Sequence, residues 1–286
     1  MPDRFANKNR SFMDQYAMRR PLLSIVMPTF NSVQYLQDSL ASLNRQTSQD
    51  FELLLCDAGS TDESINLVFK SLGSKARLVS DHDSGVPDAL NKGFGHSKGD
   101  VLCWLNSDDV IVSPVTVERI LQHYYEKNFD VLVADSVSLD AEGIISKTQY
   151  AFVSKEKNLD YSGNIFTGSL FFSKRAWEIF PGFSNRFKYA FEYELTDFLF
   201  RNNRTNKINL IAGGFRHNPN GLSKVFRHEL SKELKVIRGH RKPPSRGRYL
   251  RERIKLHARD GCFLRSVTNT LIDHNQGKQW DDLSVV

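Results

Sequence analysis

The sequence alternates short apolar runs with segments whose apolar residues recur at helical spacing. Each apolar run has the length and the β-branched or leucine-rich composition of a buried strand. Strands that alternate with helices in this way predict right-handed βαβ crossovers and a mostly parallel sheet with helices on both faces. We therefore expect an α/β, Rossmann-like fold. The predicted strands are residues 22–27, 51–56, 77–80 and 101–105, and the predicted helices are residues 33–43, 65–72 and 89–94.

The second half of the chain has a less regular pattern. Strands are expected at residues 131–135 and 166–172, with antiparallel hairpins between residues 136 and 154. Helices are expected near residues 174–179 and 189–202, and a basic helical stretch follows from Lys224. This pattern divides the chain into an N-terminal extension (1–21), a main α/β domain (22–225) and a basic helical C-terminal region (226–286).

Composition excludes several protein classes. With 286 residues, of which 40% are hydrophobic and 25% charged, the chain can bury a sizeable core and is neither disordered nor collagen-like. Its three cysteines lie far apart without a C-x-x-C pair, so neither a disulfide framework nor a zinc site is expected, and a reducing cytosol fits. We see no secretory signal in residues 1–20 and no apolar stretch long enough to span a membrane. We expect a cytoplasmic protein that at most lies on a membrane surface.

The positive charge is concentrated in one segment. The net charge is +6, yet residues 224–259 contain thirteen Lys and Arg against three Glu, which is +10 for the segment and −4 for the rest. Such a segment can grip nucleic acid, lie on an anionic membrane surface, or be a solvated helix that packs on a partner subunit. Because no nucleic-acid-binding motif accompanies the charges, we favour the inner face of the cytoplasmic membrane and expect no nucleic acid partner.

Polar residues follow three of the predicted parallel strands. Thr29 and Asn31 come after the first strand, Asp57 after the second, and the pair Asp108 and Asp109 after the fourth. Ligands of open α/β sheets bind outside the carboxyl ends of the strands, so these residues are expected to form one site. The paired carboxylates there suit Mg²⁺ or Mn²⁺, although acids in this position also serve as turn and helix-cap residues.

Four motifs at these strand ends resemble family 2 glycosyltransferases of the GT-A fold, over roughly residues 22–225. The resemblance implies inverting transfer of a sugar from a nucleotide diphosphate sugar, usually with a divalent metal such as Mn²⁺ or Mg²⁺. The matching segments are residues 23–31, 57–62, 83–93 (with its Asp-Ser-Gly and Asp-Ala-Leu-Asn-Lys-Gly pieces) and 104–109.

The resemblance also implies which residues hold the donor. The strand-end Pro-Thr-x-Asn and the Asp after the second strand would hold the base and ribose. A second group of residues, from the segment 83–93, would contact ribose or diphosphate. A helix-cap region with a solvated lysine is an equally good interpretation of that second group. The donor-site residues are Pro28, Thr29, Asn31 and Asp57, with Asp88, Asn91 and Lys92 as the second group.

The D-x-D motif of the family departs from its pattern here. Its first position is Asn106, whose amide can still bind a ribose hydroxyl but carries no charge. We therefore place the metal on Asp108, with Asp109 as a second ligand or an orienting neighbour. His217 is a candidate third ligand, because many relatives place a His beyond the catalytic helix. A lone His is also commonly a surface or packed residue.

Inverting transfer needs a carboxylate that deprotonates the acceptor hydroxyl. In the family this base lies at the start of a helix, and the alignment of residues 190–195 gives that position to Glu192. Glu194 and Asp197 are the alternatives, and both also fit solvated helix acids. Residues 166–169 are expected in the acceptor wall, whereas Trp104 is expected in the core.

The resemblance thus implies a metal-dependent inverting glycosyltransferase of bacterial type that adds one sugar to a surface polysaccharide or a lipid-linked oligosaccharide. Its partners are the nucleotide diphosphate sugar, the saccharide or lipid-linked saccharide acceptor and an anionic membrane, with a homo-oligomer left open. One competing interpretation is a sugar-nucleotide nucleotidyltransferase, against which the absence of a glycine-rich phosphate loop near the first strand argues. The other is a non-catalytic nucleotide-sugar-binding protein, for which Asn106 is the argument.

Overall fold

The structure is a computed structural model that describes residues 23–80, 83–151, 165–184, 186–219, 221–238 and 275–283. The predicted N-terminal extension and residues 239–274 of the basic C-terminal region lie outside these ranges. Within them, no helix is both long and apolar enough to cross a membrane.

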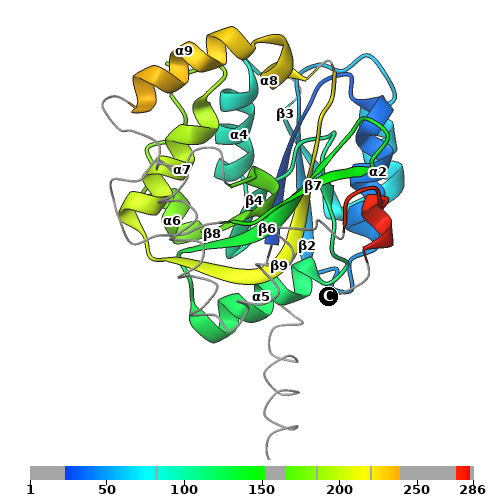
Figure 1. Cartoon of the computed structure of the whole chain (residues 1–286), viewed down its shortest axis with the longest axis horizontal. Helices are drawn as coiled ribbons and strands as arrows, with labels where there is room; N and C mark the ends of the chain where they lie inside the picture. The colour runs from blue at the N-terminus through cyan, green and yellow to red at the C-terminus, as the bar shows by residue number, and fades with distance from the viewer. Residues whose placement is uncertain are drawn as a thin grey trace, which may run out of the picture.

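One sheet organises the fold, with strand order β3-β2-β1-β4-β8-β6-β9-β5 and with β7 paired to β6 (Figure 1). The first four strands pair in parallel, as the alternating pattern predicts, and β4 pairs with β8 in the antiparallel sense. The predicted α/β class is confirmed. The strands are β1 (Leu23–Thr29), β2 (Phe51–Asp57), β3 (Ala76–Ser80), β4 (Val101–Trp104), β5 (Val110–Ile111), β6 (Val131–Leu139), β7 (Ile145–Gln149), β8 (Leu170–Ser173) and β9 (Thr205–Arg216).

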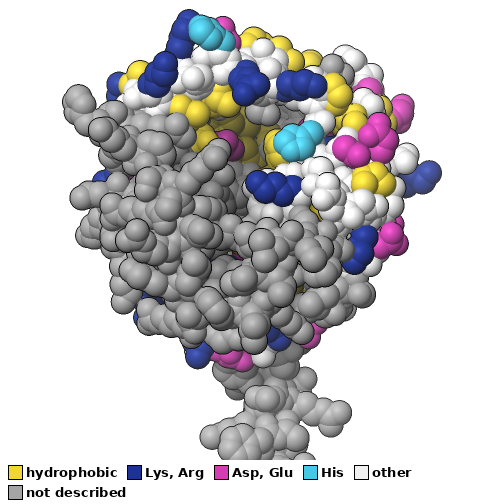
Figure 2. Space-filling view, in the orientation of Figure 1, with side chains coloured by type: hydrophobic (Ala, Val, Ile, Leu, Met, Phe, Trp, Pro, Cys, Tyr) yellow, Lys and Arg dark blue, Asp and Glu magenta, His cyan; other side chains and the backbone are white. Residues whose placement is uncertain are grey.

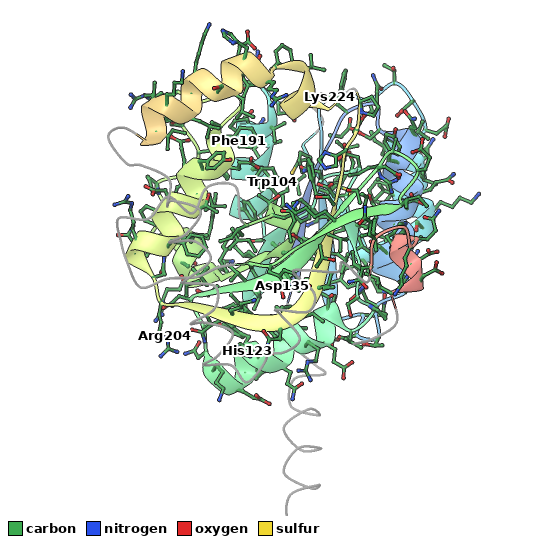
Figure 3. All side chains as sticks on the ribbon, in the orientation of Figure 1. Trp104, His123, Asp135, Phe191, Arg204 and Lys224 are labelled. Carbon is green, nitrogen blue, oxygen red and sulfur yellow. The ribbon has the colours of Figure 1, made fainter. Side chains whose placement is uncertain are left out.

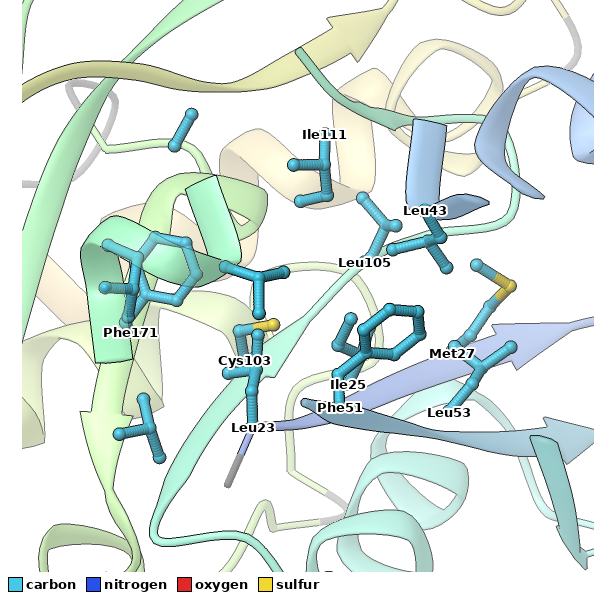
Figure 4. Packing of buried hydrophobic residues seen from close by; sticks show 14 of the residues in the cluster. Leu23, Ile25, Met27, Leu43, Phe51, Leu53, Cys103, Leu105, Ile111 and Phe171 are labelled. Atoms are coloured by element: carbon cyan, nitrogen blue, oxygen red, sulfur yellow. The ribbon is translucent and has the colours of Figure 1, made fainter. Parts of the chain in front are cut away.

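Helices cover both faces of the sheet, because adjacent residues along each strand point to opposite sides. Ile25, Leu53 and Cys103 pack on one side against α2, α3 and α5 (Figure 4), while neighbouring strand residues pack on the other side against α4, α6 and α7. The helices are α2 (Val33–Asn44), α3 (Ser64–Leu72), α4 (Val86–Gly95), α5 (Thr116–Lys127), α6 (Lys174–Glu178), α7 (Phe191–Asn202), α8 (Leu222–Val225) and α9 (Arg227–Arg238).

Helix α4 packs unusually close to the sheet at Gly93. A Cβ atom at this position would lie 2.3 Å from Cγ1 of Val26 and 2.9 Å from Sγ of Cys56. Only glycine allows this approach, which packs the second half of α4 directly on β1 and β2.

The long strand β9 is absent from the sequence prediction. It pairs in parallel with β6 along most of its length, and at its far end it pairs with the short β5 (Figure 1). Its apolar residues are interrupted by Asn209 and by Gly213–Gly214, which hides the two-residue alternation of a strand.

The last described segment returns to the main domain. Gln279 forms a β-bridge with Ile144 beside β7, and Trp280 is buried with Val137 and Leu139 of β6. The guanidinium of Arg45 lies 5.1 Å from the centre of the Trp280 ring. Part of the predicted C-terminal region therefore contributes to the packing of the α/β domain.

Candidate active site

The carboxyl ends of β1, β2 and β4 lie side by side. Thr29 pairs with Asp57 at the ends of β1 and β2, and the amide of Leu105 donates to the carbonyl of Val26, 3.0 Å away. The predicted gathering of these strand ends at one edge is confirmed. Figure 2 shows a hollow below α8, with hydrophobic side chains on its floor, an acidic side chain at one wall, and basic and histidine side chains around its rim.

Asp57 shapes the loop that follows β2. Its buried carboxylate accepts hydrogen bonds from the backbone amides of Gly59 and Ser60, at 2.9 and 2.6 Å, and from Oγ of Ser60 at 2.5 Å. Oγ of Ser60 in turn accepts a hydrogen bond from the amide of Asn31 at 2.9 Å. Asp57 thereby joins the loops after β1 and β2 into one rigid unit.

The loop after β1 presents three different groups. Asn31 adopts a positive φ of 47°, and its side-chain oxygen accepts a hydrogen bond from the amide of Thr61 at 2.9 Å. Thr29 is only 4% exposed, and its hydroxyl has no hydrogen-bond partner among the described residues. Phe30 is 59% exposed, which leaves a large aromatic side chain open to solvent at the edge of the site. Pro28, at the end of β1, is half-buried.

Helix α4 carries the second group of predicted donor-site residues, with Asp88 in its first turn and Lys92 in its last turn. Asp88 accepts a hydrogen bond from the amide of Ser84 at 3.0 Å and pairs with Lys92 at 2.9 Å, and these two contacts lower the pKa of Asp88. Asn91 exchanges two hydrogen bonds with the backbone of Phe183, at 2.9 and 2.8 Å. The amide of Asn91 thus ties α4 to the segment before α7, and a donor contact by it stays a prediction.

The loop after β4 holds Asp109 inside the protein. Asp109 is 1% exposed, and its two carboxylate oxygens accept hydrogen bonds from the side chain of Asn106 at 2.8 Å and from the amide of Arg216 at 2.9 Å. Burial, reinforced by the charge of Asp108, raises the pKa of Asp109 well above its usual range. Asn106 also accepts a hydrogen bond from Nε1 of Trp104 at 2.7 Å. This geometry fits Asp109 as the orienting neighbour of the site rather than as a ligand.

Asp108 lies at the surface of the same loop. Its carboxylate accepts a hydrogen bond from the side-chain amide of Asn218, 3.0 Å away. His217 is exposed instead, with its ring edge-to-face on Phe215 at a centroid distance of 5.0 Å. The residue beside Asp108 is therefore Asn218, one position beyond the predicted His217, whose role as a metal ligand stays a prediction.

The donor atoms at Asp108 suit a divalent ion that is completed by a substrate. In the described ranges, no three His, Cys, Asp or Glu side chains form a metal-binding cluster. Mg²⁺, however, commonly takes one or two protein carboxylates together with substrate phosphate oxygens and water. The carboxylate of Asp108 and the side-chain amide oxygen that Asn218 can present after rotation are oxygen donors of this kind.

Arg216 is a site residue that the sequence analysis missed. It is 2% exposed, and its guanidinium donates to the carbonyls of Asp108 and Ala141, both at 3.0 Å, and to the carboxylate of Asp38 at 2.6 Å. The guanidinium also lies 5.0 Å from the ring centre of Tyr35. One buried cation thus links the loop of Asp108 to α2 and to the turn after β6. Sequence periodicity carries no signal for such a residue.

Glu192 lies in the first turn of α7. The residue is half-buried, and in the part of the chain that the structure describes its carboxylate makes no hydrogen bond or ion pair. Burial raises the pKa of Glu192 to about 7. The carboxylates of the two alternative candidates for the base have partners. Glu194 accepts two hydrogen bonds from Ser184, and Asp197 pairs with Arg201 at 2.8 Å.

Aromatic packing holds the start of α7 against the sheet. Phe191 stacks on Trp104 with a centroid distance of 5.5 Å and an interplanar angle of 22°, and Figure 3 shows the two residues next to each other. Trp104 is 3% exposed, so its predicted place in the core is confirmed. Because Trp104 also donates to Asn106, a continuous set of contacts runs from the loop of Asp108 to the residue before Glu192.

The segment predicted as the acceptor wall is mostly internal. Thr167, Gly168 and Ser169 are buried, and Oγ of Ser169 accepts a hydrogen bond from the amide of Gly213 at 2.9 Å. A Cβ on Gly213 would approach the carbonyl oxygen of Gly168 to 2.8 Å, so the segment packs tightly on β9. A contact of this segment with the acceptor stays a prediction.

Solved structures with a similar fold are glycosyltransferases. The S. aureus TarS fragment 1–349 in complex with UDP-GlcNAc aligns with a TM-score of 0.60 and 18% identity, over 76% of this chain and 65% of that chain. The mannosyltransferase PcManGT from Pyrobaculum calidifontis, in complex with GDP-Man and Mn²⁺, aligns with a TM-score of 0.56 and 18% identity, over 79% and 67% of the two chains. At this identity the likeness shows the fold, which is the GT-A fold.

Sequence comparison finds relatives that match over part of their length. A chondroitin synthase of Pasteurella multocida is 26% identical over 185 residues, which are 64% of this chain and 19% of that protein. A PGL/p-HBAD biosynthesis glycosyltransferase of Mycobacterium bovis is 40% identical over 106 residues, which are 36% of this chain and 41% of that protein. This chain therefore spans less than half the length of either relative.

The family description Glycosyl transferase family 2 matches residues 24–187, which is more than half of the chain. The matched range contains β1, β2, β4 and α4, and with them the strand-end loops described above. The chain belongs to glycosyl transferase family 2.

Proposed function

We propose that this protein is an inverting glycosyltransferase that moves a sugar from a nucleotide diphosphate sugar to an acceptor hydroxyl. The observation that carries the proposal is the half-buried carboxylate of Glu192, which has no partner among the described residues and whose pKa burial raises to about 7. It lies one residue beyond Phe191, which stacks on Trp104 at the end of β4. A general base works best when its pKa lies near the working pH.

The reaction is a single displacement. The acceptor oxygen attacks the anomeric carbon from the face opposite the nucleotide diphosphate, and the new C–O bond forms as the bond to the diphosphate breaks. Glu192 takes the proton of the acceptor hydroxyl, and the nucleotide diphosphate leaves with the bonding electrons. Glu194 and Asp197 are less suited to this role, because hydrogen bonds to Ser184 and Arg201 already occupy their carboxylates.

The strand-end loops supply the donor site in this proposal. The hydroxyl of Thr29, buried without a partner among the described residues, and the exposed ring of Phe30 are available to a nucleoside at the end of β1. Lys92, half-exposed in the last turn of α4, provides positive charge for the diphosphate, and its ion pair with Asp88 holds the ammonium group in place. Asp57 and Asn31 act by holding the two loops in shape.

Asp108, with Asn218 beside it, would hold Mn²⁺ or Mg²⁺ in the proposed enzyme. When bound, the ion would offset the charge that develops on the leaving diphosphate. Arg216 would keep the loop of Asp108 in place, because its guanidinium donates a hydrogen bond to the backbone carbonyl of Asp108.

The relatives support a saccharide acceptor. The chondroitin synthase and the mycobacterial glycosyltransferase are named for a polysaccharide and for PGL/p-HBAD, and TarS was solved with UDP-GlcNAc. We infer that this protein extends a surface polysaccharide or a lipid-linked oligosaccharide on the cytoplasmic side of the membrane.

The basic C-terminal region is proposed to hold the protein on anionic lipid. Arg227, Lys232 and Lys235 are exposed on α9 together with Val236, and residues 224–259 carry a net charge of +10. Each basic residue near an anionic surface contributes roughly 1 kcal/mol, and salt screens the attraction. We expect the full chain to sediment with phosphatidylserine vesicles at low salt and to be released at high salt. Equal binding to neutral phosphatidylcholine vesicles would assign the basic residues to a solvated face or to a partner subunit.

A binding panel and a product analysis together test the proposed activity. Thermal shifts with UDP, GDP and dTDP, with and without Mn²⁺, should single out one nucleotide diphosphate and show that the metal strengthens its binding. Proton NMR of the product made from the corresponding α-linked donor should show a β-linkage at the transferred sugar. A retained α-linkage, or no nucleotide binding at all, would refute the proposal.

A further inference from the structure

A carboxylate from α9 lies on the backbone amides that precede α7. Oε1 of Glu233 accepts a hydrogen bond from the amide of Lys188 at 3.0 Å. Oε2 of Glu233 accepts hydrogen bonds from the amides of Tyr189 and Ala190, both at 2.8 Å. One side chain therefore satisfies three consecutive backbone donors, across 43 to 45 positions of sequence.

Helix α7 needs such a partner. The first amides of a helix have no carbonyl partner within the helix, and they carry a partial positive charge. The residue at the N-cap of α7 is Ala190, whose side chain cannot accept a hydrogen bond. Hydrogen bonds to an ionised carboxylate are shorter and stronger than neutral ones. Of the three amides that Glu233 binds, that of Ala190 belongs to this unpaired set, and those of Lys188 and Tyr189 fix the chain just before the helix.

Further contacts dock α9 on the same region. The ring of Tyr189 stacks on Phe226 with a centroid distance of 4.6 Å and an interplanar angle of 23°. Ile237 packs against the apolar cluster that contains Phe191 and Leu195 of α7. Figure 1 shows α9 lying across the top of α7.

We propose that Glu233 is a positioning residue for sugar transfer, which acts by holding the first turn of α7 and with it Glu192. The stack of Phe191 on Trp104 holds this turn against the sheet. Glu233 holds it against α9, through the amide of Ala190 directly before the turn. The proposal rests on the proposed role of Glu192 as the base. It makes α9 a working part of the transferase, although its charge pattern resembles that of a separate arm.

Substitutions of Glu233 test the proposal in the full chain. Glu233→Ala removes all three hydrogen bonds, whereas Glu233→Gln keeps one acceptor oxygen and turns an NH₂ group toward the amides. A misplacement of about 1 Å can cost about 100-fold in rate, so we expect kcat to fall by about 10- to 100-fold in Glu233→Ala and less in Glu233→Gln. The affinity for the nucleotide diphosphate should stay unchanged. Glu229→Ala, one helical turn earlier at an exposed position of α9, is the matched control and should leave kcat unchanged.

Hydrogen exchange separates this proposal from the assignment of Glu192. The amides of residues 188–190 should exchange faster in Glu233→Ala than in the parent and in Glu229→Ala, whether or not Glu192 is the base. If Glu192 is the base, adding Glu233→Ala to Glu192→Gln should cause no further loss of kcat. An active Glu192→Gln variant would refute the base assignment alone. The positioning role would be overturned if kcat or the amide exchange is unchanged in Glu233→Ala. It would also be overturned if Glu233→Ala lowers kcat in the Glu192→Gln background as much as in the parent, or if both Glu233 variants lose nucleotide binding.

Discussion

Replacing Glu192 by Gln should stabilise the protein at alkaline pH while it removes the activity. Burial raises the pKa of Glu192 from 4.5 to about 7, because the charged form loses its contact with water. A change of this size corresponds to an upper limit of about 3 kcal/mol of unfolding free energy. Since the side chain is half-buried, solvent screening reduces our expectation to about 1–2 kcal/mol.

The sign follows from proton binding. The folded protein binds the proton of Glu192 more tightly than the unfolded chain does, so ionisation of this group costs stability. The cost is absent below about pH 4.5, grows as the pH rises through the interval to about 7, and is complete above it. Glutamine cannot ionise and never incurs this cost. The variant should match the parent near pH 4 and exceed its stability by about 1–2 kcal/mol near pH 8.

Urea unfolding at the two pH values measures the effect, and Glu194→Gln provides the control. The carboxylate of Glu194 accepts hydrogen bonds from Oγ and the amide of Ser184 at 2.7 and 3.2 Å, so its replacement should lower stability. Turnover of Glu192→Gln should fall by about 10²–10⁴-fold, and the parent rate should rise with pH through about 7. The reasoning is refuted if the stability difference is the same at both pH values, or if the variant keeps its turnover.

Four further substitutions test the rest of the site. Asp108→Ala should abolish the Mn²⁺-dependent part of nucleotide diphosphate binding in calorimetry. Asn218→His should strengthen this part by offering an imidazole beside Asp108. The same metal dependence in the parent and both variants would contradict the metal site. Arg216→Met should lower the unfolding free energy by about 2–4 kcal/mol in urea, because two half-buried carbonyls and the carboxylate of Asp38 lose their donor. A loss below about 1 kcal/mol would contradict its linking role. Phe30→Ala should weaken nucleotide diphosphate binding by about 1–3 kcal/mol, the usual contribution of a base stacked on an aromatic ring, and unchanged affinity would place the base elsewhere.

Local patterns were sufficient for the first half of the fold. The apolar runs that became β1, β2 and β4 are buried at every residue except Pro28, and such runs are recognisable because both faces of the strand meet a core. The turn residues after them mark where each strand ends, and parallel pairing then brings those ends to one edge. For this reason the sequence by itself determined the α/β class, the edge of the sheet where these strand ends meet, and the family.

The partners of the site residues depend on contacts that no local pattern records. Asn218 reaches Asp108 across 110 positions and Arg216 reaches Asp38 across 178, because β9 runs beside β6 and ends next to the loop after β4. One residue along a strand reverses the direction of the side chain, so whether residue 217 or 218 meets Asp108 depends on how β9 ends and not on its composition. The tertiary structure alone therefore decided that Asn218 adjoins Asp108, that Arg216 is a buried link and that an acid of the basic segment, Glu233, holds the backbone just before α7.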